Sequence, residues 1–510
     1  MTGILAAGLL VTALASARAA RADHVRISLE PPPADAAAGL LVAGRGKTVS
    51  REGAERVLAD VPAARCPCPI TIYLTLPRDE EHNVHRYRVA IAGDGYHGLL
   101  LSNRTRIPGL VSIYDIEPTV RALDEGETPP LTSRDDPDPE GKLGELDARL
   151  TEAHDSRGPA SYVVFGLGGL FALLALLLRS AFWGRAAILV GPVALAGGLT
   201  LSALEVSRPR TVGLALLGIV GGAALAGAAL TRARLAFAVA LLAIFPVYVV
   251  VLAVSQETSS LAAFGPHPDG GVRFFGISNQ VETLLLVPGL LGAALLGTAA
   301  VPLVGACVLV VVGASRLGAD GGGVLVFGAG YLFLWLRLRG IALTARNLAL
   351  AAGAAVAAGL VLVGLDAALG GSSHISRTLG DGPGALAGEL AHRWHVSLDG
   401  FVSSWHATVI ISASLVVLAW LALQQPRSEV VDAVLVALAV SLLVNDSPRE
   451  VAAYGALSCA ALRFWFDASS RLATRAPGVA HRPLRALSGR LRRRGDRVAD
   501  RPRGGDAPAG

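Results

Sequence analysis

Long apolar runs without a charged side chain dominate the chain from residue 161 onward and constrain its fold more than any other feature. A helix needs about 20 consecutive apolar residues to cross the hydrocarbon core of a bilayer. Only 17% of the 510 residues are charged, against about 25% in ordinary soluble domains. We therefore predict an α-helical polytopic membrane protein with about eleven spans. The predicted spans are 161–179, 187–204, 211–230, 235–254, 283–300, 302–316, 322–336, 347–369, 407–423, 430–445 and 450–466.

The polar residues before the first span predict a small exported domain. A short apolar core, Ile4–Leu14, precedes small residues that suit a signal peptidase. Alternating strands at Ile70–Leu76 and Tyr87–Ala92, with a helix at Ser50–Leu58, are typical of an α/β domain. The predicted parts are a signal peptide or uncleaved anchor at 1–22, a small N-terminal extracytoplasmic α/β domain at 23–122, an acidic linker with a short helix at 123–160, a transmembrane bundle at 161–466, and a basic disordered cytoplasmic tail at 467–510.

The arginines indicate which way the bundle faces. With the N-terminal domain outside, the loops predicted to be inside carry most of the arginines near the spans, and eleven more follow from Arg471 to Arg503. This asymmetry obeys the positive-inside rule, with Arg208 and Arg210 as the main exceptions. We expect a plasma-membrane protein whose basic tail attracts membrane lipid. No aromatic residues interleave with the tail arginines, so we expect no nucleic-acid partner.

The segment Thr105–Thr119, with the sequence TRIPGLVSIYDIEPT, resembles a late strand-turn-helix of alkaline-phosphatase-superfamily domains. Gly93–Gly98 precedes it where that family often has a His-Gly ligand pair, which would make His97 a metal ligand. The family also requires an early aspartate with a nucleophile and an Asp-His set for two metals. Residues 23–90 contain no recognisable set of this kind. The resemblance therefore implies a truncated or degenerate relative with a binding or structural role.

The most unusual polar segment is Val272–Glu282, which runs directly into an apolar span. In the predicted topology this segment lies at the outer face, as do the turn Ser315–Gly323, Asp366 and the long loop Gly370–His406. Ionisable groups at membrane depth are costly, so they are functional candidates. The candidate catalytic residues are Glu282, Asp320, His392 and His395, and the candidate substrate-binding residues are Arg273, Asn279, Arg316, Arg377 and Arg393.

Three chemical interpretations of this set remain open. The arginines can bind phosphate or pyrophosphate through paired guanidinium contacts, with Gly276 and Gly321–Gly323 letting backbone amides approach. One of the acids or histidines would then act as a base on a sugar hydroxyl. Alternatively, His392 and His395 lie on one helical face and hold a metal with His374 or His406. In the third interpretation, the arginines pair with the acids and join the loops. The sequence itself identifies no cofactor, and we predict no metal site.

The pattern Arg273-x-x-Gly276-x-x-Asn279, followed by Ser315-Arg316 and a long outer loop, is similar to O-antigen ligases and polymerases. That resemblance implies that Arg273 and Arg316 hold the pyrophosphate of a polyprenyl-linked glycan while His392 or His395 assists the acceptor. The whole chain also resembles actinobacterial multi-pass membrane proteins that have a phosphatase-like outer domain and no settled activity. In this chain, Phe275 and Gln280 replace the Tyr and Glu of their loop.

These observations predict a cell-envelope protein with an outer-face polar site that binds or processes a lipid-linked or phosphorylated substrate. The sequence leaves open whether the protein is an enzyme. One alternative is a membrane transporter or channel, favoured by Asp366, Pro288 and Pro302. Another is a non-catalytic scaffold that uses the N-terminal domain for docking.

Overall fold

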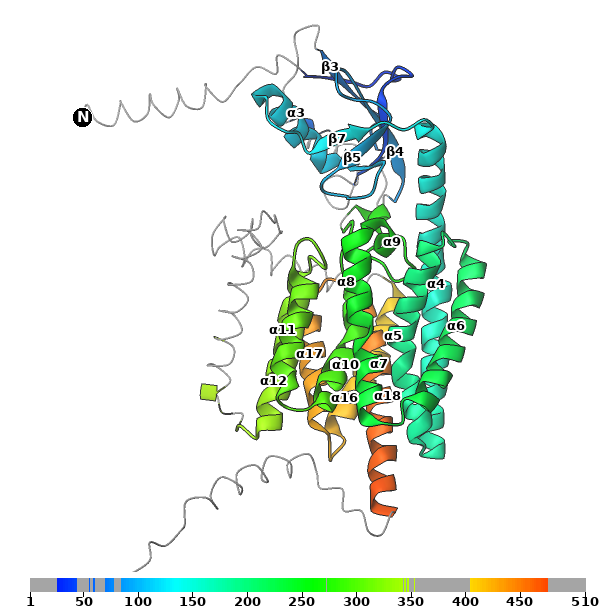
Figure 1. Cartoon of the computed structure of the whole chain (residues 1–510), viewed down its shortest axis with the longest axis vertical. Coiled ribbons are helices and arrows are strands. Elements are labelled where there is room, and N and C mark those ends of the chain that lie inside the picture. Colours follow the sequence, from blue (N-terminus) through cyan, green and yellow to red (C-terminus); the bar gives the residue numbers. More distant parts are fainter. Residues whose placement is uncertain are drawn as a thin grey trace, which may run out of the picture.

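The computed structural model describes residues 25–43, 69–77, 84–271, 273–342 and 404–475, together with isolated positions between these ranges. Figure 1 shows a small sheet domain next to one end of a bundle of helices. The mainly helical chain with a small N-terminal α/β region confirms the predicted fold class at this level. The predicted helix at residues 50–58 lies largely outside the described residues, as do Cys66 and Cys68.

Seven strands form one mixed sheet in the order β1-β3-β4-β2-β5-β7, with β6 paired to β2. Strands β1 and β3 run parallel, whereas β3 and β4 are antiparallel. The predicted strands near residues 70 and 87 are confirmed as β3 and β4. The strands are β1 Val25–Ser28, β2 Ala37–Val42, β3 Ile70–Leu74, β4 Arg86–Ala92, β5 Leu99–Ser102, β6 Leu110–Ser112 and β7 Leu131–Arg134.

The segment that resembles alkaline-phosphatase domains has a strand, a turn and a helix. These are β6, η2 (Ile113–Asp115) and α3 (Ile116–Glu125). A capping box closes the turn, because Ser112 Oγ accepts a bond from the Tyr114 N–H and Asp115 Oδ2 accepts one from the Ser112 N–H at 3.0 Å. Helix α3 buries Ile116 and Val120 in the core of the sheet domain. Its local fold therefore rests on capping and apolar packing.

Helix α4 (Pro139–Leu178) joins the sheet domain to the bundle without a break. Its 40 residues correspond to a length of about 60 Å. Asp138 caps its start by accepting a bond from the Gly141 N–H. Leu143, Leu146 and Leu150, which the sequence places on one face of a short helix, are buried against the sheet domain. The residues predicted as a linker thus contain β7 and the first turns of α4.

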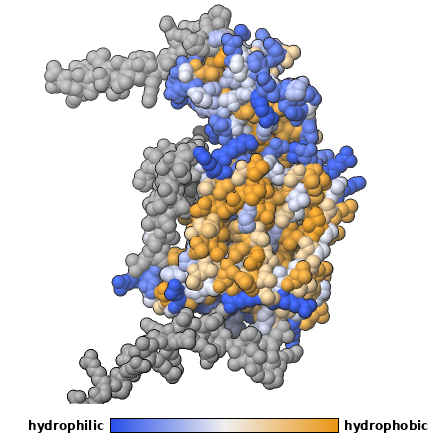
Figure 2. Space-filling view, in the orientation of Figure 1, coloured by the Kyte–Doolittle hydropathy of each residue, from blue (hydrophilic) through white to orange (hydrophobic). Residues whose placement is uncertain are grey.

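Among the residues that the structure describes, seven helices are long and apolar enough to cross a membrane. Figure 2 shows them as an apolar band between two hydrophilic ends. This count does not confirm the predicted total of eleven spans. The seven are α4, α5 (Ala181–Ala203), α6 (Pro209–Leu230), the consecutive α7 and α8 (Arg234–Leu242 and Ile244–Val254), α10 (Asn279–Leu296), α12 (Gly321–Arg339) and α16 (Trp405–Leu423).

Three further predicted spans coincide with helices that do not reach this length and apolarity. They are α11 (Ala300–Gly313), α17 (Glu429–Val444) and α18 (Pro448–Arg475). The predicted span at 347–369 lies outside the described residues. Between α8 and α10 the chain forms a short helix, α9 (Gln256–Ser260), and a single turn, η3 (Pro268–Gly270).

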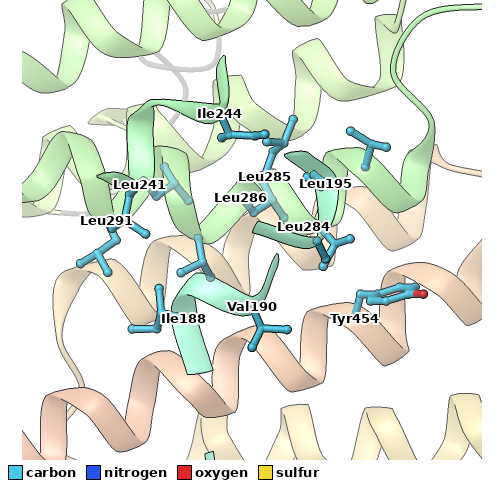
Figure 3. Close-up of a cluster of buried hydrophobic side chains, with 14 of the residues drawn as sticks. Ile188, Val190, Leu195, Leu241, Ile244, Leu284, Leu285, Leu286, Leu291 and Tyr454 are labelled. Carbon is cyan, nitrogen blue, oxygen red and sulfur yellow. The ribbon is translucent and has the colours of Figure 1, made fainter. Parts of the chain in front are cut away.

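Helix α10 lies at the centre of the bundle. It packs against α5, α7, α11, α12, α17 and α18. In Figure 3, Leu284, Leu286 and Leu291 of α10 lie among apolar side chains of α5, α7, α8 and α18. Because α10 is enclosed on most sides, the polar residues of its first turn are buried by the neighbouring helices.

Candidate functional site

The segment Arg273–Ile277 lies between the sheet domain and the bundle. Phe274 is buried in an apolar cluster with Leu40 and Leu110 of the sheet and Leu146 of α4. The guanidinium of Arg106 lies 3.9 Å from the ring centroid of Phe275, a geometry that favours a cation–π interaction. The two aromatic residues that mark this segment in the sequence therefore hold the sheet domain against the bundle.

A glycine at residue 276 lets this segment approach the turn that follows α11. Gly276 has φ +91°, and a Cβ there would lie 2.1 Å from the carbonyl oxygen of Gly318. The next amide, Ile277 N–H, donates to the same oxygen at 2.9 Å. Only a residue without a side chain fits this position. This close backbone contact brings Arg273 near Asp320 at the end of the turn.

Ser278 begins helix α10 immediately after this contact. Its Oγ accepts a bond from the Val281 N–H, which is the usual arrangement for a serine N-cap. Asn279 and Glu282 therefore fall in the first turn of α10, where the partial positive charge of the helix N-terminus favours a carboxylate.

Arg273 and Asp320 form an ion pair across the segment and the turn. Arg273 Nη2 donates to Asp320 Oδ1 at 3.2 Å, and Nη1 donates to the carbonyl of Ile277. Asp320 is 1% exposed, whereas the Arg273 side chain is 31% exposed. Burial disfavours the charged guanidinium, but the neighbouring carboxylates, Asp320 first among them, outweigh burial and raise the pKa of Arg273. The Arg273 guanidinium thus remains charged.

Glu282 is fully buried and receives its hydrogen bonds from α17. Ser441 Oγ donates to Glu282 Oε1 at 3.1 Å, and Asn445 Nδ2 lies 3.2 and 3.1 Å from the two carboxylate oxygens. Asn445 Nδ2 also lies 2.8 Å from Ser441 Oγ. These neutral donors stabilise a buried carboxylate but leave its charge uncompensated.

Asn279 and Gln280 connect α10 to α18 and the residues before it. Asn279 Nδ2 donates to Asp446 Oδ1 at 2.8 Å and to Ser447 Oγ at 3.2 Å. Gln280 Nε2 donates to the hydroxyl of Tyr454 at 2.6 Å. These contacts hold the first turn of α10 in place. The donor groups of Asn279, a predicted substrate-binding residue, are used within the protein.

We define the carboxylate cluster as Arg273, Glu282, Asp320, Ser441 and Asn445. The Asn445 carboxamide bonds one of its acids and lies near the other. Its nitrogen bonds Glu282, and its oxygen lies over Gly322, where a Cβ would be 2.5 Å from Asn445 Oδ1 and 3.6 Å from Asp320 Oδ1. The cluster holds two buried carboxylates and one guanidinium. Its formal charge is negative, so the arrangement is suited to a proton or cation.

The structure therefore brings together three predicted site residues, Arg273, Glu282 and Asp320, with Asn279 in the same helical turn. Arg316 is exposed on the turn that carries Asp320, and its carbonyl accepts a bond from Gln256 Nε2 at 3.1 Å. His406, considered as a metal ligand, lies at the start of α16 against the ring of Trp405. Four predicted site residues lie outside the described residues, namely His392, His395, Arg377 and Arg393. Asp366 and His374 also lie outside them.

Sequence reasoning missed the residues of α17 and its C-terminal end that complete the cluster. Ser441 and Asn445 stand in and just after an apolar run, and Asp446 follows directly. The polar break Asn445-Asp446-Ser447 between two apolar runs was the available signal. Within the described parts of the chain, no group of three His, Cys, Asp or Glu side chains is arranged to hold a metal ion.

The chain matches no protein-family model, and no curated protein or solved structure gives a match. The resemblances to alkaline-phosphatase domains and to O-antigen ligases stay predictions. The geometry of the carboxylate cluster is therefore the feature of the protein that indicates a function.

Proposed function

We propose that this protein is an ion-coupled membrane transporter in which the carboxylate cluster binds a proton or a small cation. The observation that carries the proposal is the burial of Glu282 and Asp320 beside one arginine, Arg273. Ionisable groups at membrane depth are costly and often mark ion or proton pathways. Well-packed apolar side chains would join the same helices at a lower desolvation cost. Two carboxylates at this position therefore favour a chemical role.

The cluster also joins helices that have to move if an ion is to pass. Glu282 belongs to the central helix α10, Asp320 precedes α12, and Ser441 belongs to α17. Hydrogen bonds and an ion pair can be exchanged for bonds to an ion or water, whereas contacts between packed apolar side chains cannot.

We also propose that the sheet domain is extracytoplasmic and that the membrane is the plasma membrane, because the arginine distribution favours this orientation.

The second candidate function is the binding or processing of a lipid-linked or phosphorylated envelope substrate. The exposed Arg316, on the turn that ends at Asp320, favours it. Arg273 favours the transporter instead, because its guanidinium faces Asp320. Substituting Arg316 by Ala tests the second candidate, since lipid-linked precursor would accumulate at a normal protein level. Unchanged precursor pools would contradict it.

The test of the transporter proposal uses proteoliposomes on a solid-supported membrane. A proton or Na⁺ gradient is imposed with mixtures of amino acids, sugars and organic anions, and the transported charge is recorded as a current. We expect a gradient-dependent current that Glu282→Gln and Asp320→Asn abolish. Glu205→Gln is the matched control, because the Glu205 side chain is 63% exposed on the same bundle. If the wild-type protein gives no current with any mixture, the proposal is wrong.

A further inference from the structure

The carboxylate of Asp320 is held in an unusual way for the residue that precedes a helix. Asp320 is the N-cap of α12, but its side chain accepts no bond from the amides of the first helical turn. An aspartate at this position usually accepts such a bond. Oδ1 accepts a bond from Arg273 instead. The carboxylate therefore lies beside the first turn of α12 but bonds Arg273 instead of capping the helix.

The second oxygen, Asp320 Oδ2, is buried and has no hydrogen-bond donor among the residues that the structure describes. A buried carboxylate oxygen without a partner is strongly disfavoured. Such atoms in native proteins usually have a water, a proton or an ion as their partner. This orphan atom is independent of the charge of the cluster and indicates a ligand.

The charge of the cluster limits what that ligand is. With both acids ionised, Glu282 and Asp320 together carry two negative charges, and Arg273 carries one positive charge. One monovalent cation makes the sum zero, whereas a divalent cation leaves an excess positive charge in a buried site. The N-termini of α10 and α12 add partial positive charge, which helps to keep the carboxylates ionised. They supply no donor to Oδ2.

Two glycines of α12 lie close to this oxygen. A Cβ at Gly323 would lie 3.0 Å from Asp320 Oδ2, and one at Gly322 would lie 2.5 Å from Asn445 Oδ1. The carboxylate of Asp320 and the carboxamide oxygen of Asn445 therefore both lie beside the first turn of α12, which consists of glycines. Carboxylate and amide oxygens are hard ligands that suit hard cations. A proton on Oδ2 is the competing ligand, and the salt dependence of unfolding distinguishes it from a cation.

We infer that Asp320 Oδ2, with the Asn445 carboxamide oxygen beside it, forms a binding site for one monovalent inorganic cation. This inference rests on the proposed function and specifies the ion that the cluster binds. Glu282 is held by its three bonds from α17 and supplies negative charge without contacting the ion. Gly322 and Gly323, in the first turn of α12, lie next to these two oxygens.

Thermal unfolding of the purified full-length chain in detergent tests the inference. NaCl, KCl and choline chloride are compared at constant ionic strength, with tryptophan fluorescence as the readout. We expect Na⁺ or K⁺ to raise the Tm of the wild-type protein saturably, by about 3 °C well above Kd, relative to choline. Choline is too large for the site, so it controls for ionic strength.

Two variants make the result specific. Asp320→Asn removes the charge and should abolish the cation-dependent shift, while Glu205→Gln should keep it. The wild-type titration also stands alone if Asp320→Asn fails to fold. If Tm is the same in all three salts, or if Asp320→Asn keeps the full shift, the inference is overturned.

The outcome also separates this inference from the transporter proposal. A cation-independent Tm combined with a proton-driven current leaves the transporter intact and overturns the cation site, with a proton as the ligand. A saturable cation shift without any current supports the cation site and makes the ion structural, which contradicts transport.

Discussion

Asn445 donates through a single nitrogen to both carboxylate oxygens of Glu282, at 3.2 and 3.1 Å, across 163 residues of sequence. Both side chains are buried, at 3% and 0% exposed. This one carboxamide joins α17 to the central helix α10. Its oxygen lies over Gly322, near the carboxylate of Asp320.

Asn445→Ala should destabilise the protein strongly, because among the described residues it leaves the buried Glu282 carboxylate with Ser441 alone as a donor. Losing a bond to a buried charged group costs about 2–3 kcal/mol. The unfolding free energy in mixed detergent micelles measures this loss. Thr200→Ala is the control, since its exposed hydroxyl bonds a carbonyl of its own helix. Equal stabilities of the two variants would show that the Asn445–Glu282 contact contributes nothing.

Gly276→Ala should be more harmful than Gly95→Ala. Both glycines have positive φ, +91° and +85°, but only at Gly276 would the new Cβ meet another atom, the Gly318 carbonyl oxygen. The conformational strain of about 1–2 kcal/mol is common to both variants. The difference between their unfolding free energies therefore isolates the clash, which must displace the segment from the turn. Equal unfolding free energies of the two variants would mean that the turn at Gly318 moves aside at no energetic cost.

The contact between Arg106 and Phe275 should couple the sheet domain to the bundle. A double-mutant cycle with Phe275→Leu and Arg106→Ala is expected to give about 0.5–1 kcal/mol. Limited proteolysis of the sheet domain is the second readout, since weaker docking exposes the loops beneath it. Tyr114→Leu, which removes the ring facing Arg104 within the domain, is the control. A coupling energy of zero would indicate that the contact between Arg106 and Phe275 does not hold the domain to the bundle.

The sequence predicts the membrane class and the small α/β region, because composition and periodicity carry this information. Arg273, Glu282 and Asp320 were grouped by topology alone, and the structure does bring them together. Which helices pack against α10 is determined by the tertiary structure, and the periodicity of the sequence does not predict it. Ser441 and Asn445 were missed for this reason. The alternative in which arginines pair with acids was correct for Arg273 and Asp320.

The continuity of α4 was missed for a related reason. The prolines and acids at residues 123–160 are typical of a solvated linker, and the break between polar and apolar halves resembles a domain boundary. A helix can cross such a boundary when apolar side chains in its first turns pack against a folded domain. Leu143, Leu146 and Leu150 do so here, and the remaining turns continue into the bundle.

Arg273→Ala should be among the most harmful substitutions in the cluster, and Asp320→Asn should partly rescue it. Removing the guanidinium leaves the Asp320 carboxylate buried and unpaired, which costs about 3 kcal/mol or more. In the double variant the neutral amide no longer needs a counter-charge, so the two effects are not additive. Unfolding free energies of the four proteins of the cycle give the coupling. The exposed pair Arg88–Glu140, with side chains 49% and 66% exposed, provides the comparison and should give about 0.5 kcal/mol or less. Additive losses at Arg273 and Asp320 would show that their ion pair is no more important than one at the surface.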